Sequence, residues 1–459
     1  MRLYSLKLSY NFKVLQRVKV MKTEVLSYKN RFKLLLVISS MLVLGLPVSA
    51  QVDFNEYFTS GGLRVDLIIT GDHESSDIVK QELRMEPYWG GNKNNLIDPF
   101  EYGDHMFKVR DVASGQVIYS RGFSTLFSEW QTTEESRRIR RSFYQVIVFP
   151  YPKEDVVLEV FERNEENRFD RIYELAVDPQ SKYINRDVPV ALDITEILVN
   201  GDPADKVDIA FIAEGYREDE MEKFVSDARR FSHYLLSREP FSSYTESFNI
   251  RAVHSPSIES GTDLPGKDIW KNTACNSNFY TFELERYLTT YDYKSVCDIA
   301  GHVPYDHVFV IVNHEKYGGG GIYNHYSMGT SDHQYSLQVF IHEFGHGFSG
   351  LGDEYYTSDV AYSDFYKLHL EPWEPNLTTL VDFDSKWKDM VHDTIPVPTP
   401  GDVQYEGVTG VFEGGGYVAK GVYRPAIDCT MKNTATADEF CAVCKRAIVR
   451  MIEYYTQQK

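Results

Sequence analysis

The chain has 459 residues, of which 42% are hydrophobic and 25% are charged. This composition can bury large cores, so it excludes general disorder, and the length predicts two domains rather than one. Acidic residues exceed basic ones by a formal net charge of −19. A surface of that sign argues against nucleic acid and anionic membranes as partners.

Residues 1–50 have the tripartite order of a secretory signal peptide. Basic residues precede an apolar run at 34–46, and small residues follow at Val48 and Ala50. We expect cleavage after Ala50 and a translation start at Met21. An uncleaved membrane anchor is the alternative, although the run is short for a span. Cleavage removes nine basic residues and one acidic residue, which leaves a charge of −27. The mature chain is then expected to have no membrane span and to be secreted, periplasmic or held at a cell surface.

Residues 51–190 are predicted to form an all-β sandwich. Five segments alternate in hydrophobicity or stay apolar over strand-like lengths, and turn-forming residues separate them. These segments are 63–70, 106–111, 116–123, 142–150 and 156–163. They contain no cluster of chemically active side chains, so the domain either supports the next one or acts as a recognition module.

Strand and helix patterns alternate across residues 191–459. Apolar strands are predicted at 206–216, 248–255 and 307–314, and a helix with one apolar face is predicted within 218–238. This alternation predicts a three-layer α/β domain.

The glycine-rich segment 318–329 resembles a phosphate loop only superficially. It lacks the Gly-Lys-Ser/Thr that would hold phosphate and magnesium. We interpret it as a loop and an edge strand that can pair with an extended substrate backbone. A plain turn is the alternative.

The segment HEFGHGFSGLGDEYY begins at His342, inside a predicted helix over 336–350. Since His342 and His346 are four residues apart, their rings project from the same side of the helix and can bind one Zn²⁺. Glu343 lies beside the first histidine, where its carboxylate can reach the water that zinc activates and act as general base. A solvated or core-packed pair of histidines is the alternative.

A catalytic zinc site needs a third protein ligand and one open position. Gly350 can adopt the left-handed conformation that ends a helix, so the chain can return toward the metal. Asp353 is the preferred third ligand, and Glu354 is the alternative because either carboxylate can supply an oxygen.

All five cysteines follow the leader. In an oxidising compartment Cys275 and Cys297 are expected to close a local loop, and Cys429 is expected to pair with Cys441 or Cys444. The last three are expected to clamp the terminal helix. A zinc site made of cysteine alone is disfavoured, because three clustered thiols are one short of a closed tetrahedron.

The HEFGHGFSGLGDEYY segment resembles the signature of the IgA-peptidase-like zinc metallopeptidases (metallopeptidase family sixty-four), whose pattern is HExxHxxxGxxDE. KVDIAFIAEGY at 206–216, SIESGTD at 257–263 and the segment 411–448 agree with the same family, and the β segment before them resembles its amino-terminal domain. The resemblance implies a zincin-like catalytic domain. It carries over His342, His346 and Asp353 as ligands and Glu343 as base.

Three residues near the carboxy terminus are further candidates. Met431 resembles the methionine that lies beneath the zinc in related metallopeptidases, with ordinary core packing as the alternative. Tyr423 and Arg424 could stabilise an oxyanion if they reach the cleft, and structural roles are the alternative.

Together these features predict a secreted zinc metallopeptidase, an endopeptidase that cleaves protein or peptide substrates with one catalytic zinc ion. A protein- or glycan-binding module with a structural or decayed metal site is the rival interpretation, and a zinc-dependent amidase is the third. The intact Glu343 favours an enzyme, because a structural metal site has no use for a base. The sequence does not indicate an oligomeric state.

Overall fold

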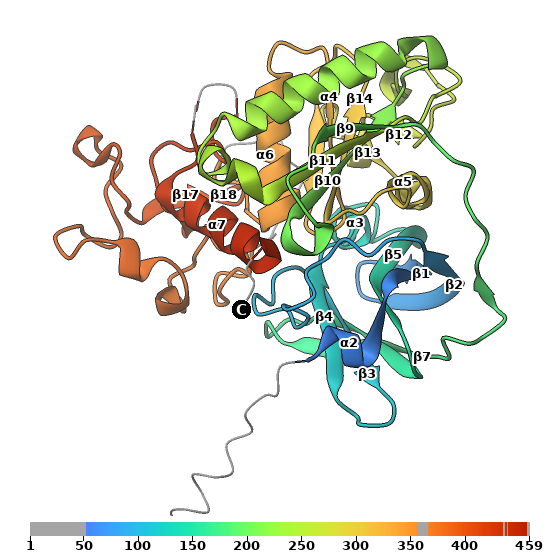
Figure 1. The fold of residues 1–459 in the computed structure, drawn as a ribbon. Coiled ribbons are helices and arrows are strands. Elements are labelled where there is room, and N and C mark those ends of the chain that lie inside the picture. Colours follow the sequence, from blue (N-terminus) through green and yellow to red (C-terminus); the bar gives the residue numbers. More distant parts are fainter. Residues whose placement is uncertain (1–51, 357–365, 435–436, 438, 457–459) are drawn as a thin grey trace, which may run out of the picture. The chain divides into compact units, whose positions relative to one another are not determined.

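The computed structural model describes residues 52–356, 366–434, 437 and 439–456, so the predicted leader lies outside the described residues. Two four-stranded sheets form the amino-terminal part, in the orders β5-β1-β2-β8 and β4-β3-β6-β7 (Figure 1). Their strands are β1 (Phe58–Gly71), β2 (Ser76–Glu86), β3 (His105–Asp111), β4 (Val117–Phe123), β5 (Arg141–Pro152), β6 (Val156–Arg163), β7 (Phe169–Val177) and β8 (Ile184–Asn185). Two short helices accompany them, α2 (Phe54–Tyr57) and α3 (Leu126–Gln131).

The alternating residues of these strands place one apolar face of each sheet in a shared core. On β1, Leu63 and Val65 are fully buried, and they join Val109 and Leu158 from the other sheet in one cluster. The five predicted strand segments are confirmed as β1, β3, β4, β5 and β6. β2 and β7 are absent from the prediction because charged residues interrupt their apolar alternation.

A six-stranded sheet with the order β15-β16-β14-β10-β11-β9 forms the core of the second part. The four inner strands run parallel, and β15 and β9 lie antiparallel at the two edges. The strands are β9 (Ile194–Leu198), β10 (Val207–Glu214), β11 (Phe248–Val253), β14 (His307–Val312), β15 (Gly319–Ile322) and β16 (Tyr326–Thr330). The helices are α4 (Met221–Leu236), α5 (Tyr293–Ala300), α6 (Ser336–Ser349) and α7 (Ala442–Thr456). Two small hairpins are β12 (Ser277–Asn278) with β13 (Thr289–Thr290), and β17 (Phe412–Gly415) with β18 (Val418–Arg424).

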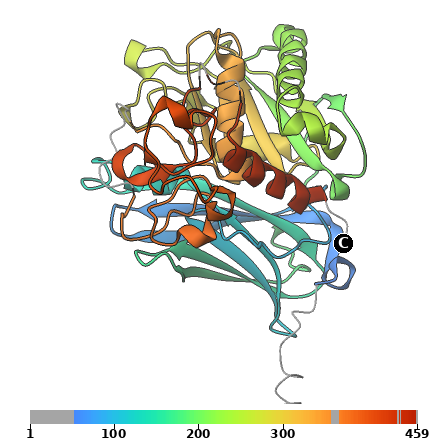
Figure 2. The ribbon, with the colours of Figure 1, turned by 90° about the vertical axis from the view of Figure 1, so that its left-hand side faces the viewer.

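Helices α4, α6 and α7 share a core with one face of the six-stranded sheet (Figure 2). Phe340 of α6 lies at its centre, with ring centroids 4.9 Å from Phe231 of α4 and 4.6 Å from Phe309 of β14. On the opposite face, Ile212 of β10 packs in one cluster with α5 and with Phe143 of β5. Helices therefore lie on both faces, as predicted, but the sandwich shares the second face with α5.

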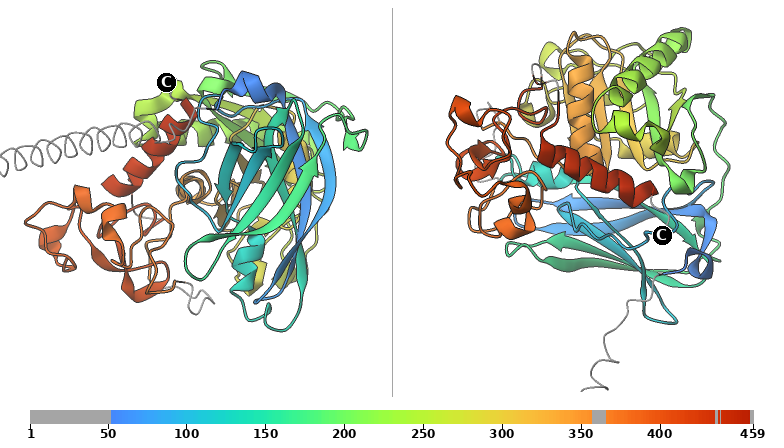
Figure 3. Two further views of the ribbon diagram at one scale, coloured as in Figure 1. Left: turned by 90° about the horizontal axis from the view of Figure 1, so that it is seen from below. Right: turned by 60° about the vertical axis from the view of Figure 1, so that its left-hand side comes forward.

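Hydrogen bonds tie the sandwich side to the end of α7, which crosses beside α6 (Figure 3). The Asn92 and Asn95 amides donate to the carbonyls of Tyr455 and Tyr454, at 2.6 Å and 2.7 Å. These carbonyls belong to the last described turn of α7, and carbonyls near a helix end need partners outside the helix. The amino-terminal part thus supplies hydrogen-bond donors to the last described turn of α7.

The expected disulfides are absent, since all five cysteines carry free thiols. Cys275 and Cys297 are both buried in the cluster that includes α5, as unpaired thiols. The Sγ atoms of Cys429 and Cys444 lie 3.8 Å apart, well beyond the S–S bond length of about 2.0 Å. The predicted pairings are therefore wrong for this structure. Separately, no helix among the described residues is long and apolar enough to cross a membrane.

Acid should destabilise the fold through His105, a fully buried residue of β3. Burial lowers the pKa of His105 from the ordinary 6.5 to about 4. The Glu162 carboxylate could oppose this shift through a hydrogen bond, but at 4.0 Å it is too distant to form one. As pH falls from 6.5 toward 4, the unfolded chain therefore binds a proton that the folded chain does not. We expect the free energy of unfolding to fall by about 1.4 kcal/mol more per pH unit in the parent than in His105→Gln. Denaturant titrations across this window measure both slopes.

The matched control is His233→Gln, on the exposed side of α4, which should keep the parental slope. Equal slopes for the parent and His105→Gln would contradict the prediction.

Candidate active site

Helix α6 positions the two predicted histidine ligands. Phe340, Phe344 and Phe348 anchor it in the core, while His342 and His346 share another side with ring centroids 4.7 Å apart. The helix ends at Gly350, whose φ of 65° is left-handed as predicted. The Gly350 N–H donates to the carbonyl of His346 at 3.0 Å, which closes the last turn and redirects the chain.

That turn brings Asp353 back to the histidines. Its Oδ1 lies 3.1 Å from His342 Nε2 and 3.3 Å from His346 Nε2, and the two nitrogens are 3.1 Å apart. Ligands bound tetrahedrally at about 2.0–2.1 Å are separated by about 3.3–3.4 Å. The three atoms therefore match three corners of a metal tetrahedron. Glu354, the alternative ligand, points instead to a group of three cysteines.

The hydrogen bonds of the group also fit a metal. His342 Nδ1 lies 3.0 Å from the carbonyl of Thr430 and His346 Nδ1 lies 2.5 Å from that of Leu351. When Nδ1 donates to these carbonyls, each Nε2 keeps a free lone pair that points at Asp353. Asp353 Oδ1 is buried and accepts no hydrogen bond from the described residues. Burying a carboxylate oxygen without a partner is costly, and a bound cation would remove this cost.

Charge is concentrated in the same place. Burial alone raises the pKa of Asp353, but the His346 imidazole outweighs it, and the pKa lies well below its usual range. Burial lowers the pKa of His346, but Asp353 outweighs it and raises the pKa to about 9. The negative charge of Asp353, which favours the protonated form of His346, would also attract a metal cation.

Glu343 lies on α6 next to this group, against the edge strand β15. A Cβ built on Gly319 would lie 2.9 Å from Glu343 Cγ and Oε1, so only glycine allows β15 to approach so closely. Burial raises the pKa of Glu343, while the two neighbouring imidazoles oppose the rise. The predicted edge strand is confirmed at β15, although Tyr287 already contacts its outer side at Gly319.

Tyr417 was not predicted as part of the site. It lies in the turn between β17 and β18, and its hydroxyl donates to Asp353 Oδ2. The neighbouring Gly416 N–H donates to the Asp353 carbonyl at 2.7 Å. The Tyr417 hydroxyl fixes Oδ2 and the Gly416 N–H fixes the backbone of Asp353, so that Oδ1 faces the histidines. The only sequence signal is the run GGGY, which is typical of any turn.

The other carboxy-terminal candidates have mainly structural contacts. Arg424 donates to the carbonyls of Glu413 and Gly414 at 2.8 Å and 2.7 Å, and Tyr423 pairs with Thr378 through the backbone. These bonds stabilise the β17–β18 hairpin. Met431 is fully buried against α6, with its sulfur 3.0 Å from a Cβ built on Gly345.

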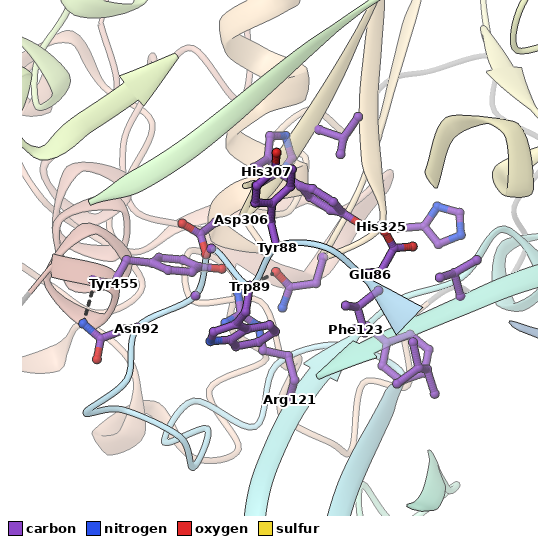
Figure 4. A pocket seen from close by; sticks show the side chains of 18 of the residues that line it. Glu86, Tyr88, Trp89, Asn92, Arg121, Phe123, Asp306, His307, His325 and Tyr455 are labelled. Atoms are coloured by element: carbon purple, nitrogen blue, oxygen red, sulfur yellow. Dashed lines mark hydrogen bonds between the residues drawn. The ribbon is translucent and has the colours of Figure 1, made fainter. Parts of the chain in front are cut away.

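A cavity of about 120 Å³ lies elsewhere, between the sandwich and the six-stranded sheet (Figure 4). Arg121, His307 and His325 line it, and none of its lining residues is a predicted metal ligand. Burial lowers the pKa of both histidines to about 3, so they stay neutral. The chemistry is therefore assigned to α6 and not to this cavity.

Comparison with known families assigns nearly all of the described chain. The family model described as IgA Peptidase M64 matches residues 195–405 and 401–452. The model described as Peptidase M64 N-terminus matches residues 53–174. No curated protein matches the chain.

Proposed function

The chain belongs to the IgA peptidase M64 family and is therefore a metallopeptidase that acts on protein, and from this premise we propose a zinc-dependent endopeptidase with a zincin-like catalytic domain. The observation that carries the proposal is the triangle of His342 Nε2, His346 Nε2 and Asp353 Oδ1, with Glu343 beside it. Two nitrogens and one oxygen are a common donor set for catalytic zinc. The export predicted from residues 1–50 completes the proposal.

His342, His346 and Asp353 would hold one zinc ion. Bound zinc would polarise the scissile carbonyl and lower the pKa of a water molecule toward about 7. Glu343 accepts the proton of the attacking water at its carboxylate and passes it to the nitrogen of the leaving amine. The Ser327 hydroxyl donates to the Glu343 carbonyl at 2.8 Å and helps to fix this turn of α6.

We propose Arg286, rather than Arg424, as the cation that would face an oxyanion, because it interacts electrostatically with both Asp353 and Glu343. Its guanidinium interacts electrostatically with Asp353 and with Tyr317, and it opposes the rise in the pKa of Glu343. A cation in this position can stabilise negative charge that develops on the substrate oxygen. The residue follows the η5 turn (Thr281–Glu283).

The proposed function is tested with a panel of unfolded proteins. We expect the full chain to cleave at least one of them at internal peptide bonds, to stop when a chelator is added, and to recover with zinc. Binding without cleavage would contradict the proposal and favour the binding module. Hydrolysis of glycan or cell-wall amides with no peptide cleavage would instead favour the amidase.

Tyr417→Phe should weaken zinc binding without removing the site. The substitution deletes the hydroxyl that donates to Asp353 Oδ2 and leaves the three ligands in place. Loss of such a supporting hydrogen bond typically weakens metal affinity by about 10–100-fold. Competition with a chelating dye measures the dissociation constant. The control Tyr183→Phe, at a position 78% exposed, should match the parent. An unchanged constant in Tyr417→Phe would refute the role assigned to the hydroxyl.

A further inference from the structure

Beyond the catalytic group, the structure gathers a second set of potential metal ligands. One atom each from Glu354, Cys429, Cys441 and Cys444 lies within 4.8 Å of the others. We propose that these four residues bind a second metal ion, with zinc as the preferred ion, at a closed structural site. Three thiols alone are one short of a closed tetrahedral zinc site. Glu354 supplies the missing fourth ligand.

The distances suit tetrahedral zinc. Zinc–sulfur bonds of about 2.3 Å and a zinc–oxygen bond of about 2.0 Å separate the sulfurs by about 3.8 Å and sulfur from oxygen by about 3.5 Å. The Sγ atoms of Cys429 and Cys444 are 3.8 Å apart. Glu354 Oε1 lies 3.1 Å from the Cys444 sulfur and 4.0 Å from the Cys441 sulfur. An ion can occupy the centre with only small side-chain adjustments.

A buried, unsatisfied carboxylate oxygen supports the same conclusion independently. Glu354 is fully buried, and its Oε2 has no hydrogen-bond partner among the described residues. Its Oε1 accepts from Asn376 Nδ2 at 3.0 Å, and that amide also donates to the Gly352 carbonyl at 2.8 Å. Asn376 thus fixes the carboxylate while one oxygen still lacks a partner. Leaving Oε2 unpaired is costly, and a metal ion bound by both oxygens of the Glu354 carboxylate would remove the cost.

Backbone N–H groups face two of the three sulfurs. The Cys441 N–H donates to Cys429 Sγ at 3.2 Å, and the Cys444 N–H donates to Cys441 Sγ at 3.5 Å. Amide donors of this kind stabilise thiolates, the form that binds metals. Arg424 and Lys432 also interact electrostatically with Glu354 and would offset the remaining negative charge.

The position of the second site suggests what the ion does. Glu354 follows Asp353, and its N–H donates to the Met431 carbonyl at 2.8 Å. The Thr430 carbonyl lies 3.0 Å from His342 Nδ1. A metal that joins Glu354 to Cys429 would therefore brace two segments that position His342 and Asp353. With four protein ligands it has no open position for substrate, which is typical of a structural site.

The test uses the full chain purified with zinc and freed of unbound metal. We expect two zinc ions per chain in the parent and one in His346→Ala. X-ray absorption at the zinc edge of His346→Ala should then show mainly sulfur neighbours at about 2.3 Å. Because this variant leaves all four proposed ligands intact, the result does not depend on how well a cysteine variant folds. It also separates the second site from the catalytic proposal, which predicts no sulfur neighbour.

Cysteine variants complete the experiment. Cys444→Ser should lose the sulfur-bound zinc, whereas the matched control Cys297→Ser, a buried thiol outside the group, should keep it. If the zinc that His346→Ala retains has only nitrogen and oxygen neighbours, the inference is wrong. A parent with no sulfur-bound zinc, or a disulfide within the group shown by intact mass, would overturn it as well.

Discussion

Glu343→Gln is expected to abolish most of the peptidase activity while leaving the metal in place. The amide has nearly the shape of the carboxylate but cannot accept the proton that peptide hydrolysis must move. Loss of a general base typically lowers kcat by about 10²–10⁴-fold. The residue is not one of the three grouped ligands, so zinc content should stay at the parental level. Steady-state kinetics on an unfolded protein and metal analysis of the same sample measure both quantities.

Glu222→Gln is the matched control for this substitution. Glu222 lies on the exposed side of α4, and the same chemical change there should leave both kinetics and metal content at parental values. If Glu343→Gln, with its zinc retained, cleaves as fast as the parent, Glu343 is not the base. If it instead loses zinc, its role is to support the metal site.

Asp353→Asn should remove the catalytic metal and, with it, the activity. The substitution preserves an oxygen near His342 and His346 but deletes the negative charge that balances a divalent cation. Loss of an outer hydrogen-bond partner already weakens metal affinity by about 10–100-fold, and loss of a direct charged ligand should cost more. The zinc dissociation constant, measured by dye competition, should rise beyond that range, and kcat/KM should fall at limiting zinc.

The control for this prediction is Asp170→Asn, at an exposed position on β7. It should leave zinc affinity and kinetics unchanged. If Asp353→Asn binds zinc like the parent, the third ligand is another group. If it binds zinc normally and loses only turnover, Asp353 acts on the substrate rather than on the metal.

Sequence patterns predicted the local parts of the site because local rules determine them. The spacing of His342 and His346 fixes their common side on a helix, and Gly350 ends that helix in the left-handed conformation that its lack of a side chain permits. The strand segments of both parts follow from runs of apolar residues or from their alternation. Strands β2 and β7, whose exposed charges hide that pattern, were missed.

Contacts between distant segments could not be predicted in the same way. Tyr417 lies 64 residues from Asp353, and Cys444 lies 90 residues from Glu354. Nothing in their local sequence specifies a partner; the fold of the β17–β18 hairpin and the packing of α7 bring them together. The sequence therefore indicates Glu354 only as an alternative ligand for the histidine site, and the disulfide predictions are wrong for the same reason.

The most direct measurement is diffraction from crystals of the full chain grown with zinc, recorded on both sides of the zinc absorption edge. We expect an anomalous peak at about 2.0–2.2 Å from His342 Nε2, His346 Nε2 and one oxygen of Asp353. Zinc-saturated crystals with no peak between these atoms, or with the three side chains turned away from a common point, would contradict it.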